Sequence, residues 1–217
     1  MITSATSGGT PCIWAKASAP RSGESAMGER VRRAAKGIGG AFRSVQIDLT
    51  RADVEWQGTQ TVSKSLKRVK RALEEAGVAA DVVEMAEGTR TAAAAAQAAG
   101  CHLDQIAKSI IFRAETSGAA VLFLTAGGNL VDAEKASAVA GEPLGKADAD
   151  LIRKQTGFAI GGVSPIGHLS PIRAWVDPRL LEFDVVYAAA GTPRHIFAVD
   201  PNILVDLAGA REAAFTG

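Results

Sequence analysis

The segment that most restricts how this 217-residue chain can fold is FAIGGVSPIGHLSPI, at residues 158–172. It holds three glycines and two prolines, whereas the residues on both sides would support strands. Glycine lets a backbone approach a neighbour closely because no Cβ intervenes, and proline fixes φ and removes a donor. The segment therefore predicts a rigid loop whose backbone N–H groups can contact a ligand.

Composition excludes several classes of protein. With 47% apolar residues, the chain can bury one substantial core. A formal net charge of +1 gives no bulk signal for a nucleic-acid or membrane partner, and we expect neither DNA nor a membrane as a partner. Cys12 and Cys101 form neither a metal motif nor a disulfide framework. No apolar run approaches the roughly 20 residues that span a bilayer, and no signal peptide is evident. We therefore expect a cytoplasmic protein.

The chain divides into two parts near residue 62. Residues 1–61 are rich in Ser, Gly, Ala and Arg without a helical or strand period, so they cannot bury enough apolar surface to offset the ordering entropy. We expect a disordered arm, or a translation start placed too far upstream, with Val62 as the real start. A sharper alternative is an arm that contacts RNA through its basic residues, Arg30, Arg32, Arg33 and Lys36. Residues 62–217 form the predicted folded domain.

The first predicted helix of this domain has two distinct faces. Its apolar residues, at helical spacing, are Val62, Leu66, Val69 and Leu73. Its basic residues, on the opposite side, are Lys64, Lys67, Arg68 and Arg71. Such a basic face is either solvated surface or a contact with a phosphate backbone.

Further elements alternate irregularly along the domain. We expect strands at 81–85, 108–115, 119–128, from 129 to 132, 172–176, 184–191 and 194–199. We expect helices at 91–99, 133–141, 147–157 and from Pro201, several of them ended by glycine. Because strands and helices do not alternate strictly, the sequence predicts a mixed α+β domain around a curved sheet.

Several familiar catalytic signatures are incomplete. The segment GEPLGKA resembles a phosphate-binding loop, but it is one residue short and Ala147 replaces the hydroxyl. Ser164 lacks the spacing of a nucleophile elbow. His102, His168 and His195 are scattered without metal-ligand spacing. The sequence therefore predicts no metal, no cofactor and no covalent nucleophile.

Three features remain that can act together on an anion or a carbonyl. Lys108 opens an apolar strand, residues 161–167 supply backbone donors, and the turn GTPRH ends at His195. Each also has a purely structural interpretation, as a strand-end lysine, a structural turn and a hydrogen-bonded histidine.

In combination these features resemble the YbaK/prolyl-tRNA synthetase editing-domain family, which hydrolyses mischarged aminoacyl-tRNA in trans. The resemblance covers about residues 65–210 and rests on TAAAAAQAAGC, KSIIF, GFAIGGVSPIGH and GTPRH, in that order. It implies a mixed sheet curved into a partial barrel with flanking helices, in agreement with the pattern above. It also implies that residues 62–217 are an aminoacyl-tRNA deacylase domain without a cofactor.

The resemblance implies roles for individual residues. Lys108 would hold the phosphate of the terminal adenosine and aid catalysis, Gly161 and Gly162 would bring backbone donors to the ester carbonyl, and His195 would line the pocket. Further substrate contacts would come from Ile160, Val163, Ser164, Pro165, Gly167, His168, Gly191 and Thr192. Lys64, Lys67, Arg68 and Arg71 would contact the tRNA. The attacking water would be helped by a ribose hydroxyl.

The implied substrate is tRNA(Pro) that carries a small non-cognate amino acid, and transient partners would be prolyl-tRNA synthetase or an elongation factor. Which amino acid is removed stays open between small polar and small aliphatic side chains. Two other functions stay open as well. One is a non-catalytic module that binds a tRNA end or a small ligand, and the other is a hydrolase of free small esters or amides.

Overall fold

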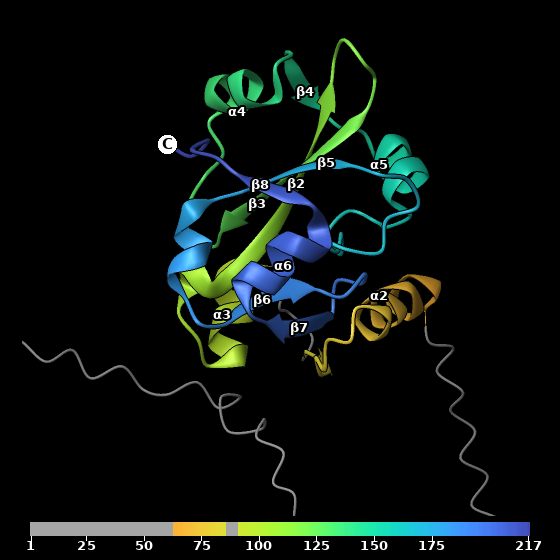
Figure 1. The fold of residues 1–217 in the computed structure, drawn as a ribbon, viewed down its shortest axis with the longest axis vertical. Coiled ribbons are helices and arrows are strands. Elements are labelled where there is room, and N and C mark those ends of the chain that lie inside the picture. The colour runs from red at the N-terminus through yellow and green to blue at the C-terminus, as the bar shows by residue number, and fades with distance from the viewer. Residues whose placement is uncertain (1–62, 86–90) are drawn as a thin grey trace, which may run out of the picture. The chain divides into compact units, whose positions relative to one another are not determined.

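A computed structural model describes residues 63–85 and 91–217 of the chain (Figure 1). The expectations for residues 1–61 and for Val62 fall outside the described residues, so the predicted arm stays a prediction.

Within these residues, one open sheet of eight strands forms the centre of the fold. The strand order is β1-β7-β6-β2-β3-β5-β8, and β4 pairs with β2 off this path. Because β3/β5, β5/β8 and β2/β6 are parallel while the other pairs are antiparallel, the sheet is mixed. The strands are β1 Val82–Glu84, β2 Ile106–Ala114, β3 Ala120–Ala126, β4 Leu144–Lys146, β5 Arg173–Val176, β6 Val186–Ala189, β7 His195–Val199 and β8 Ala210–Glu212. The predicted α+β class is confirmed, and the sheet is not a closed barrel.

The helices begin and end largely where the sequence predicted. The Ser63 hydroxyl caps the first of them and the Thr91 hydroxyl the second, and Gly100 ends the second with φ 64°. The helices are α2 Lys64–Glu75, α3 Ala92–Ala99, α4 Ala133–Ala140, α5 Ala149–Thr156 and α6 Pro201–Ala208, with short 3₁₀ helices at η1 Leu103–Gln105 and η2 Pro178–Glu182.

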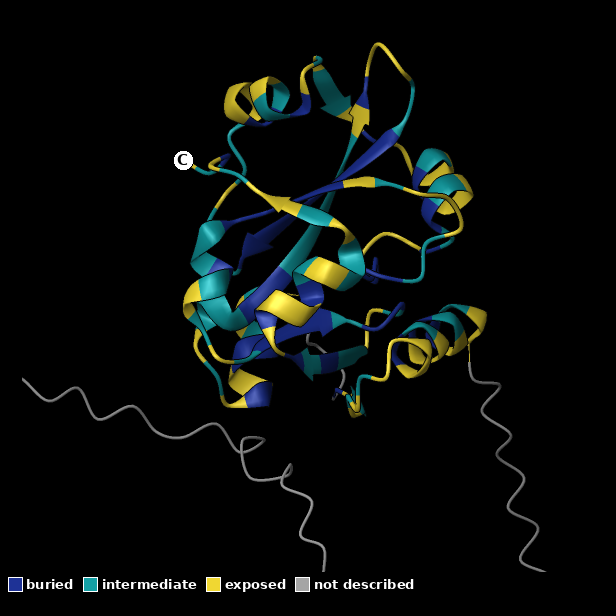
Figure 2. Cartoon of the chain, in the orientation of Figure 1, coloured by how far each residue is buried: buried dark blue, intermediate teal, exposed yellow. Residues whose placement is uncertain are grey.

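Much of the sheet is buried (Figure 2), and apolar side chains pack on both of its faces. One face carries the main core, to which α2, α5 and α6 contribute Leu66, Ile152 and Leu204. The opposite face carries two smaller clusters, one with α3 and one with α4 and Phe215. Strand residues therefore point alternately into the main core and into these smaller clusters.

Two parts of the strand assignment were wrong. Residues 129–132 form no strand, and only Val131 makes an isolated bridge, to Thr216. Here the backbone instead turns back at the end of β3, where Asn129 N donates to Ala126 O at 3.0 Å. The short strands β4 and β8 were not predicted, because their sequences, LGK and ARE, contain no β-branched or aromatic residue, whereas the equally short β1 is VVE.

Candidate functional site

The glycine loop, residues 157–168, follows α5 and reaches the turn between β6 and β7 (Figure 1). Gly157, Gly161 and Gly167 have φ values of 76°, 85° and 73°, a region that favours glycine. The side chains of Val163, Ser164, Pro165 and Ile166 are buried, whereas Ile160 is 62% exposed. The loop is therefore anchored by its own middle section, which packs against the main core.

Arg68 of α2 ties the two ends of this loop together. Its Nη2 donates to Gly157 O at 2.8 Å, and its Nε donates to Gly167 O at 3.2 Å. The guanidinium also lies 4.8 Å from the ring centroid of Phe158. Arg68 had been grouped with the exposed basic face of the helix, but its side chain turns to the loop instead.

The turn at residues 191–195 packs directly against the loop. A Cβ on Gly162 would lie 2.5 Å from the carbonyl carbon of Thr192, and a Cβ on Gly191 would lie 2.9 Å from the Phe158 ring. Gly162 can therefore lie this close to the turn only because it has no side chain. Gly161, by contrast, has nothing within 4 Å of a built Cβ.

Two adjacent backbone donors of the loop are left without a partner. In the described part of the chain, the N–H groups of Val163 and Ser164 donate no hydrogen bond, whereas Gly162 N donates to Ala159 O at 3.1 Å. Because buried N–H groups are almost always paired, two consecutive unpaired ones indicate a place for an acceptor.

His168 closes the loop as a structural residue. Its Nε2 lies 2.8 Å from Ser164 O, so Nε2 carries the proton and donates. Burial lowers the pKa of His168, the hydrogen bond to Ser164 opposes this, and the charge of Arg68 lowers the pKa further. The imidazole is therefore held neutral.

His195 is held by Thr192 within the turn. The Thr192 hydroxyl lies 2.6 Å from His195 Nδ1 and also accepts from Arg194 N at 3.4 Å. Which of the two atoms donates depends on the tautomer of the imidazole. Nε2 has no partner among the described residues, so it is left for a ligand.

Lys108 lies on the other face of the sheet from the glycine loop. Its strand neighbours Ala107 and Ile111 pack into the main core with Val163, whereas Ile110 packs with the opposite cluster. Lys108 Nζ donates to Asn129 O at 2.5 Å. Burial lowers the pKa of Lys108, and the nearby carboxylates of Asp177 and Asp104 oppose the shift.

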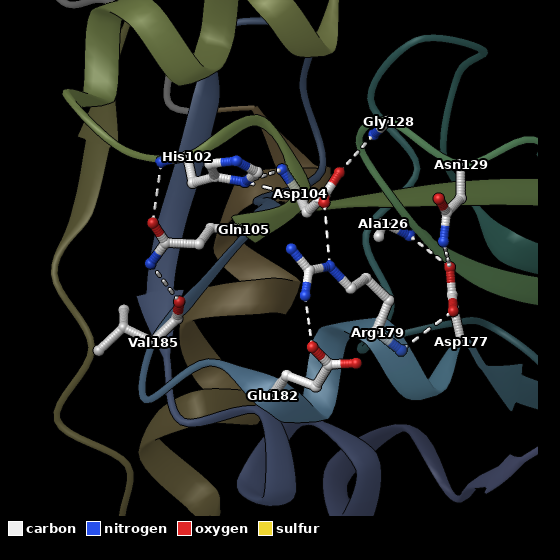
Figure 3. A network of polar contacts seen from close by, with 10 residues as sticks. All are labelled: His102, Asp104, Gln105, Ala126, Gly128, Asn129, Asp177, Arg179, Glu182 and Val185. Carbon is white, nitrogen blue, oxygen red and sulfur yellow. Dashed lines mark hydrogen bonds and ion pairs between the residues drawn. The ribbon is translucent and has the colours of Figure 1, made fainter. Parts of the chain in front are cut away.

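A polar network includes Asn129, the residue whose carbonyl oxygen accepts from Lys108 (Figure 3). The buried carboxylate of Asp177 accepts from Asn129 Nδ2 at 2.8 Å and from Arg179 N at 3.1 Å. Asp104 accepts from Gly128 N and Arg179 Nε, both at 3.0 Å. Burial raises the pKa of Asp104, but these two hydrogen bonds outweigh it and leave the pKa below its ordinary value. The network fixes the turn to which Lys108 binds.

The structure therefore brings together some of the predicted residues but not all of them. The glycine loop, Gly191, Thr192 and His195 form one assembly, and Lys108 approaches from the other face. Lys64, Lys67 and Arg71 are exposed on α2. Asp104, Asn129, Asp177 and Arg179 were missed. The sequence signal for this region was the glycine pair Gly127-Gly128 directly after β3. The structure shows the reason for a glycine there, since a Cβ on Gly127 would lie 2.0 Å from Leu103 O.

The described residues contain neither a metal-binding cluster nor a membrane-spanning helix. Among residues 63–85 and 91–217, no three His, Cys, Asp or Glu side chains are grouped so that they could hold a metal ion. No described helix has the length and apolar character needed to cross a membrane.

The chain belongs to the aminoacyl-tRNA editing domain family, whose model matches residues 86–207. It is similar to the uncharacterised protein YwhH of Bacillus subtilis, with 30% identity over 140 residues that cover 64% of this chain and 88% of YwhH.

Solved structures agree with this assignment. One is a protein proposed to be a trans-editing enzyme for prolyl-tRNA synthetase, with 44% identity and a TM-score of 0.68 over 72% of this chain and 99% of that one. Another is the hypothetical protein APE2540, with 27% identity and a TM-score of 0.64 over 69% of this chain and 99% of that one. A scaffold protein used for epitope backbone grafting matches with 43% identity and a TM-score of 0.67 over 72% and 99%.

Proposed function

We propose that this protein is a freestanding deacylase that hydrolyses the ester of mischarged aminoacyl-tRNA. The observation that carries the proposal is the pair of unpaired N–H groups at Val163 and Ser164, in a loop held rigid by Arg68. Ester hydrolysis passes through a tetrahedral oxyanion, and a fixed donor aimed at it contributes about 3–4 kcal/mol. Because an aminoacyl ester is already labile, two such donors suffice without a metal.

The remaining residues have supporting roles in this proposal. His195, whose Nε2 has no partner among the described residues, contacts the substrate beside the loop. Lys108 attracts the phosphate of the terminal adenosine from the other side of β2, and its contact with Asn129 O is exchanged for the phosphate. The attacking water is oriented by a ribose hydroxyl, because the two carboxylates near Lys108 in the described part of the chain, Asp104 and Asp177, are engaged in the network of Figure 3.

We further propose tRNA(Pro) with a small non-cognate amino acid as the substrate. The support is the structure of 44% identity that is described as a candidate trans-editing enzyme for prolyl-tRNA synthetase. A synthetase rejects an amino acid one methylene smaller by only about 1–3 kcal/mol, so a separate hydrolytic step improves fidelity. Contact with the tRNA is made by the exposed Lys64, Lys67 and Arg71 of α2, in the cytoplasm.

A deacylation panel tests the proposal. Purified full-length protein is mixed with tRNA(Pro) charged with alanine, serine, threonine, cysteine or proline, and Lys108→Ala serves as the variant. Rapid loss of a non-cognate ester that spares prolyl-tRNA and is abolished in the variant is the expected result. Tight tRNA binding without any hydrolysis would instead identify a binding module, and hydrolysis of free esters alone would identify a small-ester hydrolase.

A further inference from the structure

The central strand β2 has a gap in its pairing along one edge. On one side β3 pairs with residues 107–113. On the other side β6 pairs only with Ile106 and Ala107, and β4 pairs only with residues 112–114. Residues 108–111 therefore have no strand partner on this side, and all four are partly exposed. We call this stretch the unpaired edge.

The direction of the backbone groups shows which of them face the unpaired edge. Ala114 N donates toward the β3 side, to Ala119 O, whereas Glu115 N donates toward the β4 side, to Pro143 O. Since the direction alternates along a strand, Ser109 and Ile111 direct their N–H groups to the unpaired edge. Within the described residues, neither N–H group has a partner, nor does Ser109 O.

A side-chain hydroxyl at the same place is also unpaired. Ser109 Oγ is buried and makes no hydrogen bond in the described residues. By the alternation of the strand, the Ser109 side chain lies on the same face as Ala107 and Ile111, which is the face of the glycine loop. A buried hydroxyl without a partner destabilises the folded protein, so a ligand that satisfies it is favoured.

An α-aminoacyl group matches the unpaired edge chemically. It is one residue of peptide backbone, with an α-ammonium donor and a carbonyl acceptor spaced as in a strand. We propose that the unpaired edge binds the α-aminoacyl group of the substrate, which pairs with Ser109 as an added strand residue. Ser109 N–H donates to one lone pair of the ester carbonyl oxygen, which leaves the other lone pair for the donors of the glycine loop, and the α-ammonium donates to Ser109 O.

The orientation follows from the position of Lys108. In an antiparallel pair the chain directions oppose, so the ester and ribose extend toward the N-terminal end of the unpaired edge, where Lys108 lies. Residues directly opposite in such a pair place their side chains on the same face. The Ser109 hydroxyl therefore contacts the side chain of the bound amino acid and favours one that carries a hydroxyl, such as serine or threonine.

This inference rests on the proposed function, but binding and hydrolysis can be separated. The probe is 3′-deoxy-3′-(serylamino)adenosine, an amide analogue of the charged tRNA end that is not hydrolysed, and its N-acetyl derivative is the control. The amide resonances of full-length ¹⁵N-labelled protein are followed during titration, beside a deacylation assay.

We expect the Ser109 and Ile111 amide resonances to shift with the free-amine probe and to respond at least tenfold more weakly to the N-acetyl probe. Equal responses to both probes, or no response at Ser109, would overturn the subsite. Hydrolysis without a Ser109 response would leave the deacylase standing and the subsite refuted. A Ser109 response without hydrolysis would leave the subsite standing and refute the deacylase.

Substitution tests the side-chain contact. Ser109→Ala is expected to lower the ratio of seryl to alanyl ester hydrolysis about fivefold to tenfold, the value of one hydrogen bond. Thr125→Val is a matched control, since Thr125 also has a buried unpaired hydroxyl but on the opposite face, beside Lys108. An equal change of the ratio in both variants, or no change in Ser109→Ala, would refute the contact.

Discussion

Gly162 lies so close to Thr192 that a Cβ at residue 162 would be 2.5 Å from the carbonyl carbon and 2.7 Å from Cα of Thr192. Both of these atoms are backbone, so neither can rotate away. The glycine loop and the histidine turn are therefore positioned by each other, and the proposed site depends on this contact.

Replacement of Gly162 by alanine should separate the two segments. Because a displacement of about 1 Å of a catalytic group can cost about 10²-fold in rate, we expect Gly162→Ala to lower kcat/KM by that order. Gly161→Ala is the matched control. Gly161 has φ 85° but open space around it, so this variant should lose only about 1–2 kcal/mol of stability. Equal rate losses in the two variants would contradict the account.

Arg68 should act on turnover more than on tRNA binding. Its two hydrogen bonds to Gly157 and Gly167 involve a charged donor and contribute about 1.5–3 kcal/mol each, before partial exposure reduces them. We expect Arg68→Met to reduce the free energy of unfolding by about 2 kcal/mol and to lower kcat more than it raises KM.

Arg71 provides the control for that variant. Its pair with Glu75, at 2.9 Å, is exposed and contributes at most about 1 kcal/mol. Arg71→Met should therefore leave the unfolding midpoint and kcat nearly unchanged and affect KM for tRNA alone. A rise in KM with unchanged kcat in Arg68→Met would assign Arg68 to the tRNA contact after all.

Charge reversal on α2 should weaken the tRNA contact specifically. Lys64→Glu with Lys67→Glu is expected to raise KM for charged tRNA and to flatten its dependence on salt, because fewer phosphate counterions are released. Hydrolysis of a free aminoacyl ester should not change, since the glycine loop is intact. The effect is measured by steady-state kinetics at salt concentrations from about 50 to about 200 mM, the range in which phosphate contacts lose much of their affinity. A salt-independent KM in the unaltered protein would contradict an RNA substrate.

The neutral state of His168 predicts a dependence of stability on pH. Its pKa in the folded protein lies below the ordinary value of 6.5, and burial of the imidazole is the largest cause. Between this lower pKa and about pH 6.5, the unfolded chain therefore binds more protons than the folded protein. The contribution of His168 to the free energy of unfolding is fully present above about pH 6.5 and is lost as the pH falls through the folded pKa. Unfolding by urea at a series of pH values should show this loss in the unaltered protein and a smaller one in His168→Gln. Parallel curves would contradict it.

Local signals were sufficient for most of the fold. The apolar spacing of Leu66, Val69 and Leu73 predicted α2, and Thr91 with Gly100 predicted both ends of α3. The strands that were predicted are rich in β-branched, aromatic or other apolar residues, whereas β4 and β8 are defined by their neighbours and gave no local signal.

The site was harder to predict, because its contacts join distant segments. Helical spacing places Arg68 beside other cations, and only the packing of the loop on α2 recruits it as a clamp. The absence of a side chain at Gly162 was interpreted as access for a substrate. In the structure it also lets the backbone of Thr192 lie directly against Gly162. Strand alternation alone would have placed Lys108 on the face opposite to Ala107 and Ile111, which was a signal available in the sequence.

The most direct test of the account is the accumulation of mischarged tRNA(Pro) in a reaction that contains prolyl-tRNA synthetase and a non-cognate amino acid. Addition of this protein should reduce mischarged tRNA to near background, leave prolyl-tRNA unchanged, and have no effect when Lys108→Ala or Gly162→Ala replaces it. An unchanged level of mischarged tRNA with the unaltered protein, or an equal loss of prolyl-tRNA, would contradict a role in editing.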